Sequence, residues 1–347
     1  MDVTGIYSGL RNAYKLINNK KSAVDLNKNG TIDEGEQLRD VSDVKPFLKV
    51  LVKNENDLTL LHEVFSAINI NNDKSDPDIN TFESKLVARA CLIASGTPEK
   101  EINHYLAVLD DLFSGYVVCQ KESDRSDRGK CSPGVTSRES PDSCLKGYLW
   151  SFKNNRYDYN CFKLNEVIDN QIKYFKSGGN NTVGNCLGLT TLFTILALRT
   201  GVNIKAVTVP GHIFSKINDN NDIENTNWVG YFSNPAYPVR NESNVFICVF
   251  EIFKSRTYQY LGKGDWDKSI ECGKRALALN PNDSSLYVII AAAYKHSGKY
   301  QSAIACCEKA AAIDPKYPDT YSEMSAIYSK MHMEEKAKEY WDKFLKL

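Results

Sequence analysis

The spacing of hydrophobic side chains changes twice along the chain. Between residues 56 and 118, apolar positions recur every three or four residues, with runs around 58–68, 82–92 and 102–113. Such spacing predicts amphipathic helices. Residues 120–145 then carry many charged and turn-forming side chains and almost no apolar ones. We expect that stretch to be a surface loop or a disordered insertion.

A mixed pattern follows, from Lys146 to about Val249. Residues 164–175 are expected to form a helix with one apolar face. Residues 186–199 are apolar on nearly all sides, which predicts a buried helix that ends before Gly201.

Strand-like segments come next. Residues 204–209 and 212–217 predict two strands joined by a turn at Pro210-Gly211, and residues 223–231 predict a third. A buried helix followed by antiparallel strands indicates an α+β core.

The last hundred residues repeat at a fixed distance. Matching residues stand 34 positions apart: Gly264 and Gly298, Ala276 and Ala310, Pro281 and Pro315, Tyr287 and Tyr321, and Tyr294 and Tyr328. A 34-residue period with Gly at the helix turn, Ala at the helix crossing and Pro after the second helix is typical of the tetratricopeptide repeat, or TPR. We expect two full repeats and a third that ends at Leu347, forming an all-α superhelix.

Length and charge narrow the classes of protein. A chain of 347 residues predicts two or three domains. Lys plus Arg and Asp plus Glu both number 43, so bulk charge does not favour nucleic acid or anionic membranes. We expect a soluble protein with no membrane span. The sequence starts without a secretory signal, which predicts a cytoplasmic protein, or an extracytoplasmic one if a leader has been trimmed.

Ten cysteines are present, without a Cys-x-x-Cys pair. Four of them bracket the polar stretch: Cys119, Cys131, Cys144 and Cys161. Two disulfides are possible among these four in an exported protein, whereas free thiols are favoured in a chain without a signal.

Cys186 is the first candidate for chemistry. A loop rich in Gly and Asn leads to this Cys at the first turn of the predicted buried helix. There the helix dipole and the free backbone N–H groups favour a thiolate.

The thiolate needs a proton acceptor and that acceptor needs an orienting group. His212 starts the second predicted strand, within reach of the helix terminus, and is the candidate base. Asn227 lies on the next predicted strand and is the candidate orienting residue, giving Cys–His–Asn. The alternative interpretation is structural, because a lone Cys in a helix and a lone His in a strand are more often structural than catalytic.

These motifs resemble the catalytic core of the transglutaminase-like superfamily, in the branch of bacterial proteins that often carry TPR repeats. The resemblance rests on Gly-Asn-Cys-Leu-Gly-Leu at 184–189, Arg-Thr-Gly-Val at 199–202 and Val-Pro-Gly-His-Ile-Phe at 209–214. It covers roughly residues 80–347, without the insertion. It implies a papain-like fold, with Cys186 as nucleophile and His212 as base.

The third residue departs from the superfamily, where Asp is usual. Asn227 stands on the matching strand, whereas Asp222 and Glu224 are expected in or just after the turn. An Asn orients the imidazole without adding charge, which predicts a less stabilised ion pair.

Residues 25–36 fit the twelve-residue EF-hand loop, with Gly30 at its sharp turn. The expected calcium ligands are Asp25, Asn27, Asn29, Thr31 (through its carbonyl), Asp33 and Glu36. A second segment, Asn72–Glu83, has Lys74 and Pro77 at unsuitable positions and is at most a degenerate partner. A single site of this kind indicates a structural or low-affinity role.

Together these features predict three parts: a helical EF-hand region over residues 1–80, a transglutaminase-like core over 81–250 and TPR repeats over 251–347. The favoured function is a cysteine hydrolase or acyltransferase that acts on amide bonds through a thioester. We expect such a protein to bind calcium and no organic cofactor, and to hold a protein or peptide in its TPR groove. The alternative is a catalytically idle, calcium-binding TPR scaffold.

Overall fold

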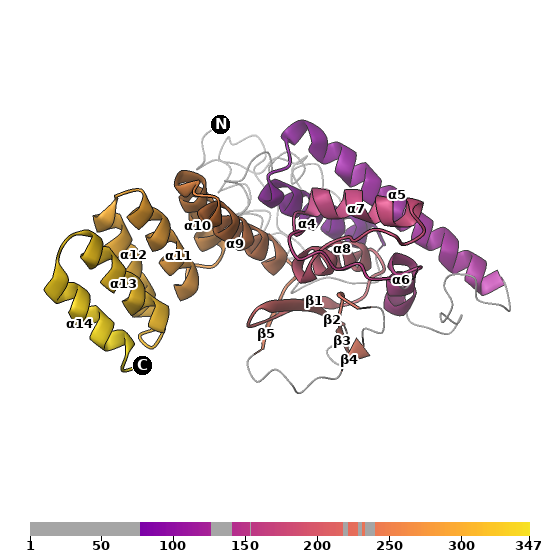
Figure 1. The fold of residues 1–347 in the computed structure, drawn as a ribbon. Helices are drawn as coiled ribbons and strands as arrows, with labels where there is room; N and C mark the ends of the chain where they lie inside the picture. The colour runs from indigo at the N-terminus through magenta and orange to yellow at the C-terminus, as the bar shows by residue number, and fades with distance from the viewer. Residues whose placement is uncertain (1–76, 126–140, 153, 218–220, 228–230, 233–239) are drawn as a thin grey trace, which may run out of the picture. The chain divides into compact units, whose positions relative to one another are not determined.

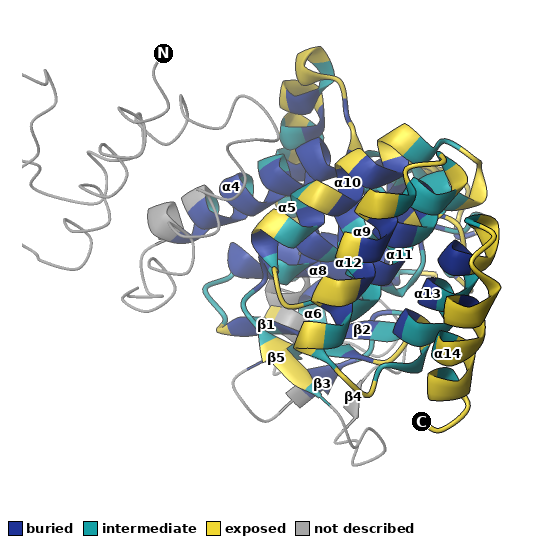
Figure 2. Ribbon diagram, turned by 90° about the vertical axis from the view of Figure 1, so that its left-hand side faces the viewer, coloured by how far each residue is buried: buried dark blue, intermediate teal, exposed yellow. Residues whose placement is uncertain are grey.

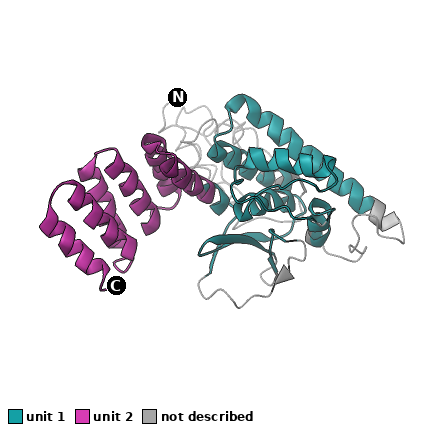
Figure 3. Cartoon of the chain, in the orientation of Figure 1, with its two compact units in different colours: residues 1–249 teal, residues 250–347 magenta. Residues whose placement is uncertain are grey.

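The computed structural model describes residues 77–125, 141–152, 154–217, 221–227, 231–232 and 240–347 (Figure 1). The chain divides into two compact units, residues 1–249 and 250–347 (Figure 3). Within the described residues, the first unit combines helices with a small antiparallel sheet, and the second is built of helices.

Five helices of the first unit are described: α4 (Pro77–Ser95), α5 (Glu99–Arg125), α6 (Pro141–Leu149), α7 (Leu164–Lys176) and α8 (Cys186–Leu198). They confirm the helices predicted around 82–92, 102–113, 164–175 and 186–199. Helix α4 runs through position 80, where a domain boundary was expected.

The expectation for residues 120–145 is wrong at both ends. Residues 120–125 are the last turns of α5, and Pro141 opens α6. Gln120, Lys121 and Glu122 are good helix formers, so a polar composition does not end the helix. Leu145 is fully buried and anchors α6 in the core.

Helix α8 is the central element of the first unit. Its side chains from Leu187 to Leu198 are all buried, because the helix packs against β1 and β2 of the sheet and also against α4, α6 and α7 (Figure 1). At its carboxyl end, the Arg199 guanidinium pairs with Asp110 at 2.7 Å and donates to Ser84 Oγ at 3.0 Å. The helix that begins with Cys186 is therefore fixed along its whole length.

The described sheet has the order β4-β3-β2-β1-β5, with antiparallel pairing throughout. Strands β1 (Ile204–Val209) and β2 (His212–Ile217) have the predicted bounds. Gly211 joins them with a φ of 74°, a conformation that glycine adopts freely. The register pairs Val209 with His212 and Ile204 with Ile217. Strand β5 (Asn241–Ser243) lies on the other side of β1.

The third predicted strand, over 223–231, is wrong. Strand β3 covers Asn221–Ile223 and β4 covers Tyr231–Phe232, while residues 225–227 form a turn between them. The sequence Asn-Thr-Asn at this turn explains the break, because Asn side chains satisfy nearby polar groups and favour turns over strand interiors.

The second unit contains six helices, which form three consecutive pairs: α9 (Ile247–Gly262) with α10 (Trp266–Leu279), α11 (Ser284–His296) with α12 (Tyr300–Ile313), and α13 (Pro318–Lys330) with α14 (Glu334–Phe344). Gly264 and Gly298 turn the first two pairs with φ values of 75° and 72°. The equivalent position of the third pair holds His332, with a φ of 57°. This conformation is strained for a residue with a Cβ.

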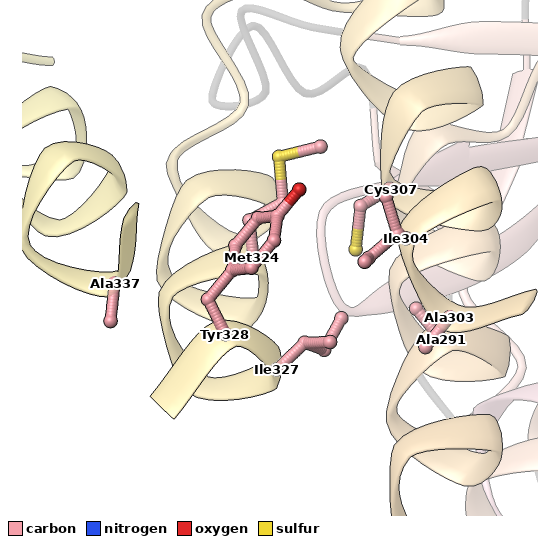
Figure 4. Close-up of a cluster of buried hydrophobic side chains, with 8 residues drawn as sticks. All are labelled: Ala291, Ala303, Ile304, Cys307, Met324, Ile327, Tyr328 and Ala337. Carbon is pink, nitrogen blue, oxygen red and sulfur yellow. The ribbon is translucent and has the colours of Figure 1, made fainter. Parts of the chain in front are cut away.

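Small and large side chains together form a buried cluster in the repeats (Figure 4). Helices α11 and α12 contribute Ala291, Ala303, Ile304 and Cys307, α13 contributes Met324, Ile327 and Tyr328, and α14 contributes Ala337. Ala337 is the one buried residue of α14, so the last helix exposes most of its surface (Figure 2).

Candidate functional site

Cys186 is the first residue of α8, and its neighbours hold it in place. Asn185 caps the helix, because its side-chain Oδ1 accepts a hydrogen bond from the Gly188 N–H at 3.1 Å. The Asn185 N–H donates to the Cys161 carbonyl at 2.7 Å, and the Asp158 N–H donates to the Gly184 carbonyl at 3.0 Å. The Cys186 thiol is free and half-buried. It therefore stands at the positive end of a rigid helix and within reach of solvent.

His212 begins β2 and lies within hydrogen-bonding reach of Cys186. A hydrogen bond with Cys186 is the largest cause that raises the pKa of His212, and one with Glu224 is the next. Burial opposes both, yet the pKa rises to about 10. Nε2 is 2.6 Å from Glu224 Oε2, which leaves Nδ1 for the thiol. The imidazole is thus held as a cation between a sulfur and a carboxylate.

Glu224 directly follows β3 and supplies the carboxylate. Its Oε1 accepts from the Thr226 N–H at 2.9 Å and from Thr226 Oγ1 at 2.6 Å, and its Oε2 contacts His212. Burial raises the pKa of this carboxyl, but the hydrogen bonds from His212 and Thr226 outweigh burial, so the pKa is lowered. Glu224 is therefore ionised where His212 is protonated.

The structure pairs the imidazole with Glu224, in the orienting position for which Asn227 was predicted. Asn227 lies in the turn after Glu224 and is not on the neighbouring strand. The register of β2 and β3 pairs Ser215 with Ile223, which makes Glu224 a diagonal neighbour of His212 on the same face. The sequence contained this signal: an acidic residue stands one position beyond the end of β3. A strand predicted through residue 231 concealed it.

A buried polar cluster lies beneath the site and was missed from the sequence. Asn225 Nδ2 donates to Ser215 Oγ at 2.9 Å and to Thr190 Oγ1 at 3.2 Å. Thr194 and Ser215 share a hydrogen bond of 3.2 Å, and Thr190 Oγ1 donates to the Ile213 carbonyl. These bonds join α8, β2 and the turn after β3, and so fix the three elements that carry Cys186, His212 and Glu224.

Two tyrosines border the site. Burial, and then the nearness of Cys186, Tyr159 and Glu224, raise the pKa of Tyr157. Its hydroxyl therefore stays protonated near neutral pH and is a hydrogen-bond donor close to the sulfur. Tyr159 is 78% exposed, and its backbone carbonyl accepts from Asn185 Nδ2 at 3.3 Å. The segment before α7 therefore places one half-buried and one exposed tyrosine near the loop that leads to Cys186.

The other cysteines differ from both sequence alternatives. Cys119 is disulfide-bonded, whereas Cys144 and Cys161 are free. Cys131 lies outside the described residues. Burial is the largest cause that raises the pKa of the Cys161 thiol to about 12, so this thiol is protonated and unreactive at neutral pH.

The predicted calcium loop, residues 25–36, lies outside the described residues, and so does the first part of the degenerate segment 72–83. From Pro77, that segment is the start of α4. Within the described part of the chain, no group of three or more His, Cys, Asp or Glu side chains is placed to hold a metal ion. None of the described helices has both the length and the apolar character that crossing a bilayer requires.

Comparison with known families gives one match. Residues 284–317 match the tetratricopeptide repeat, and this span covers the α11–α12 pair and the turn after it. No curated protein matches the chain. The TPR indicates protein–protein interaction as part of the function.

Proposed function

We propose that this protein is a cysteine-dependent hydrolase or acyltransferase that acts on amide bonds of a protein or peptide bound with the help of its TPR unit. One observation carries the proposal: His212 lies between the Cys186 thiol and the Glu224 carboxylate, with Nε2 2.6 Å from Oε2. A thiolate–imidazolium pair oriented by a third group is the arrangement that nucleophilic catalysis by cysteine requires.

The reaction has two halves. The Cys186 thiolate attacks the amide carbonyl carbon, and the first-turn N–H groups of α8 stabilise the oxyanion. The C–N bond breaks as the His212 imidazolium gives its proton to the leaving nitrogen, which leaves a thioester. Water or a second amine then gives a proton to His212 and adds to the thioester carbon, and the thiolate is released. Glu224 stabilises the imidazolium throughout.

The arrangement also supports a transglutaminase-like, papain-like core in residues 81–250. A nucleophile at the start of a buried helix, a His at the start of an antiparallel strand and a carboxylate beside the next strand agree with the motifs at 184–189 and 209–214. A carboxylate in the third position removes the expected weakness of an Asn, because it adds a negative charge next to the imidazolium.

The first experiment measures iodoacetamide alkylation of Cys186 by mass spectrometry between pH 5 and 9, in the wild type and in H212A. We expect fast labelling of the wild type well below the ordinary thiol pKa of about 8.5. At pH 6 the rate should fall roughly tenfold or more in H212A, because the imidazolium that stabilises the thiolate is gone. Cys306 is an internal control, since it is half-buried and burial raises its pKa.

Two further variants assign the third residue. E224Q should lose the low-pH labelling, whereas N227A should keep it. The opposite result would restore Asn227 to the orienting position. If Cys186 follows an ordinary thiol profile in both wild type and H212A, the enzyme proposal is wrong.

The second candidate function is then a catalytically idle scaffold, which the repeat at 284–317 supports. In that case the TPR unit binds its protein partner, and the Cys186–His212 contact is structural. The labelling profile separates the two functions, because a structural thiol gains nothing from His212.

Calcium binding at residues 25–36 is a separate part of the proposal, supported by the oxygen ligands at EF-hand spacing. Isothermal titration calorimetry of the full chain should show one calcium site that E36Q weakens strongly, because Glu36 contributes both carboxylate oxygens. E34Q is the matched control, since position 34 is not a ligand in this loop. Equal affinity of E36Q and E34Q for calcium would reject the site.

A further inference from the structure

Lys146 is a buried lysine close to the candidate site. It lies on α6, is 4% exposed, and its Nζ donates to the backbone carbonyl of Glu224 at 2.6 Å. These residues are 78 positions apart in sequence, so the bond is a tertiary connection between α6 and the segment after β3.

A lysine at this position is costly for the fold. Removing an ammonium group from water costs several kcal/mol unless it is paired, and an apolar side chain of similar length avoids that cost. Burial is the largest cause that lowers the pKa of Lys146 to about 7, with the Glu224 charge opposing the shift and the Arg156 charge adding to it. The bond from this buried amine to the Glu224 carbonyl, which connects α6 to the segment after β3, gives a reason for a lysine at this position.

The contacts of Glu224 indicate what the bond from Lys146 does. Thr226 binds the carboxylate from two residues away in the same turn, and His212 is the group that the carboxylate orients. Lys146, on helix α6, holds the backbone of Glu224 through its carbonyl oxygen. The direction of the Glu224 side chain depends on where its backbone lies, so movement of this segment changes the distance between Oε2 and the imidazole.

We propose that Lys146 is a positioning residue that fixes the Glu224 backbone at the place from which the carboxylate reaches His212. Its importance for catalysis rests on the proposed function, but its effect on the His212–Glu224 pair does not. Among the described residues, the charged groups whose nearness shifts the pKa of Lys146 are Glu224, after β3, and Arg156, before α7.

The test is the pKa of His212, measured by NMR titration of the imidazole Hε1 in the full chain carrying C186A. Removing the thiol leaves Glu224 as the group that raises this pKa, whether or not Cys186 is a nucleophile. We expect K146M to lower the His212 pKa by about one unit relative to C186A alone. E224Q should lower it further, and K146M should add nothing in the E224Q background, because Lys146 acts through that carboxylate.

K216M is the matched control. Lys216 is a half-buried lysine on the same strand as His212. Its Nζ pairs with the Glu242 carboxylate at 2.5 Å. Its removal should leave the His212 pKa unchanged. K146Q, which keeps an N–H donor without the charge, provides a second variant if K146M fails to fold, and its His212 pKa should lie between those of C186A and C186A/E224Q.

Two results overturn the proposal: a His212 pKa that K146M and K146Q leave unchanged, or an equal effect of K146M with and without E224Q. The pH profile of Cys186 alkylation in K146M, with Cys186 present, measures how the loss of Lys146 affects the reactivity of the thiol. A lowered His212 pKa together with an ordinary Cys186 profile in the wild type would leave the positioning role intact and reject the proposed enzyme function.

Discussion

At the scale of the residue, the third member of the site decides its electrostatics. An amide next to His212 would orient the ring and leave the thiolate as the principal counter-charge. The Glu224 carboxylate instead places the imidazole in a row between the Cys186 sulfur and a negative charge, with Thr226 bound to the other carboxylate oxygen. Such a row stabilises the protonated imidazole over a wide pH range, which matches the rise of its pKa to about 10.

This arrangement predicts a pH-dependent contribution to stability. The His212 pKa rises from 6.5 to about 10 on folding, so the contribution is complete below pH 6.5 and is lost as the pH rises through 10. The Glu224 pKa is lowered from 4.5, so on the acid side the contribution is lost as the pH falls below that value. E224Q should therefore lower the free energy of unfolding most between pH 4.5 and 6.5.

The expected loss is about 2 kcal/mol, the usual size for a hydrogen bond between charged groups. Urea unfolding of the wild type and E224Q at pH 6 and pH 10 measures it. N227A is the control, and any loss it causes should be the same at both pH values. An E224Q loss that does not change with pH would contradict the charge pair.

At the scale of the element, sequence patterns located the helices and strands whose apolar side chains are buried in the core. Strands β1 and β2 were predicted to the residue because both are rich in apolar and β-branched side chains and are separated by the turn at Pro210-Gly211. Helix α8 was predicted because nearly all of its sides from Leu187 onward are apolar. The segment after β3 was not, since Glu224 and Asn225 obtain their places from tertiary hydrogen bonds to α6, α8 and β2. No local periodicity records such contacts.

Gly188 provides a test of how tightly α8 is seated. A Cβ at Gly188 would lie 2.6 Å from Val167 Cγ2 and 3.0 Å from the Cys161 carbonyl oxygen. G188A should destabilise the protein by about 1–3 kcal/mol, although Ala favours a helix over Gly by about 1 kcal/mol. The displaced first turn should also slow Cys186 alkylation at pH 6.

G262A is the matched control, because Gly262 is also helical and a Cβ there meets nothing within 4 Å. Thermal unfolding should show no loss for G262A. A G188A chain as stable as the wild type would mean that α8 has room to shift toward the sheet.

At the scale of the whole molecule, the candidate site and the matched repeat lie in different units. The candidate site lies within residues 146–226 of the first unit, and the matched repeat lies in the second. Repeat arrays gain stability mainly from contacts between neighbouring helices, so a defect in their core acts locally.

A303L should separate the two units in an experiment. Ala303 is fully buried on α12 within the cluster of Figure 4, and a larger side chain there costs about 1–3 kcal/mol. We expect lower thermal stability of the repeats and an unchanged pH profile of Cys186 alkylation. A305L, at an exposed position of the same helix, should affect neither. Loss of Cys186 reactivity in A303L would show that the site depends on the repeats.

At the start of α8, one residue caps the helix and the next carries the candidate thiol. This separation has a practical consequence. Asn185 closes the helix with its side chain, so Cys186 is free of any part in initiating it. Position 186 is therefore exchangeable, and Ala or Ser there keeps the scaffold intact. A C186A chain is accordingly suited to serve as bait. Under the proposed function, it should still bind a polypeptide target without cutting or modifying it, so that the target can be recovered by affinity capture and identified.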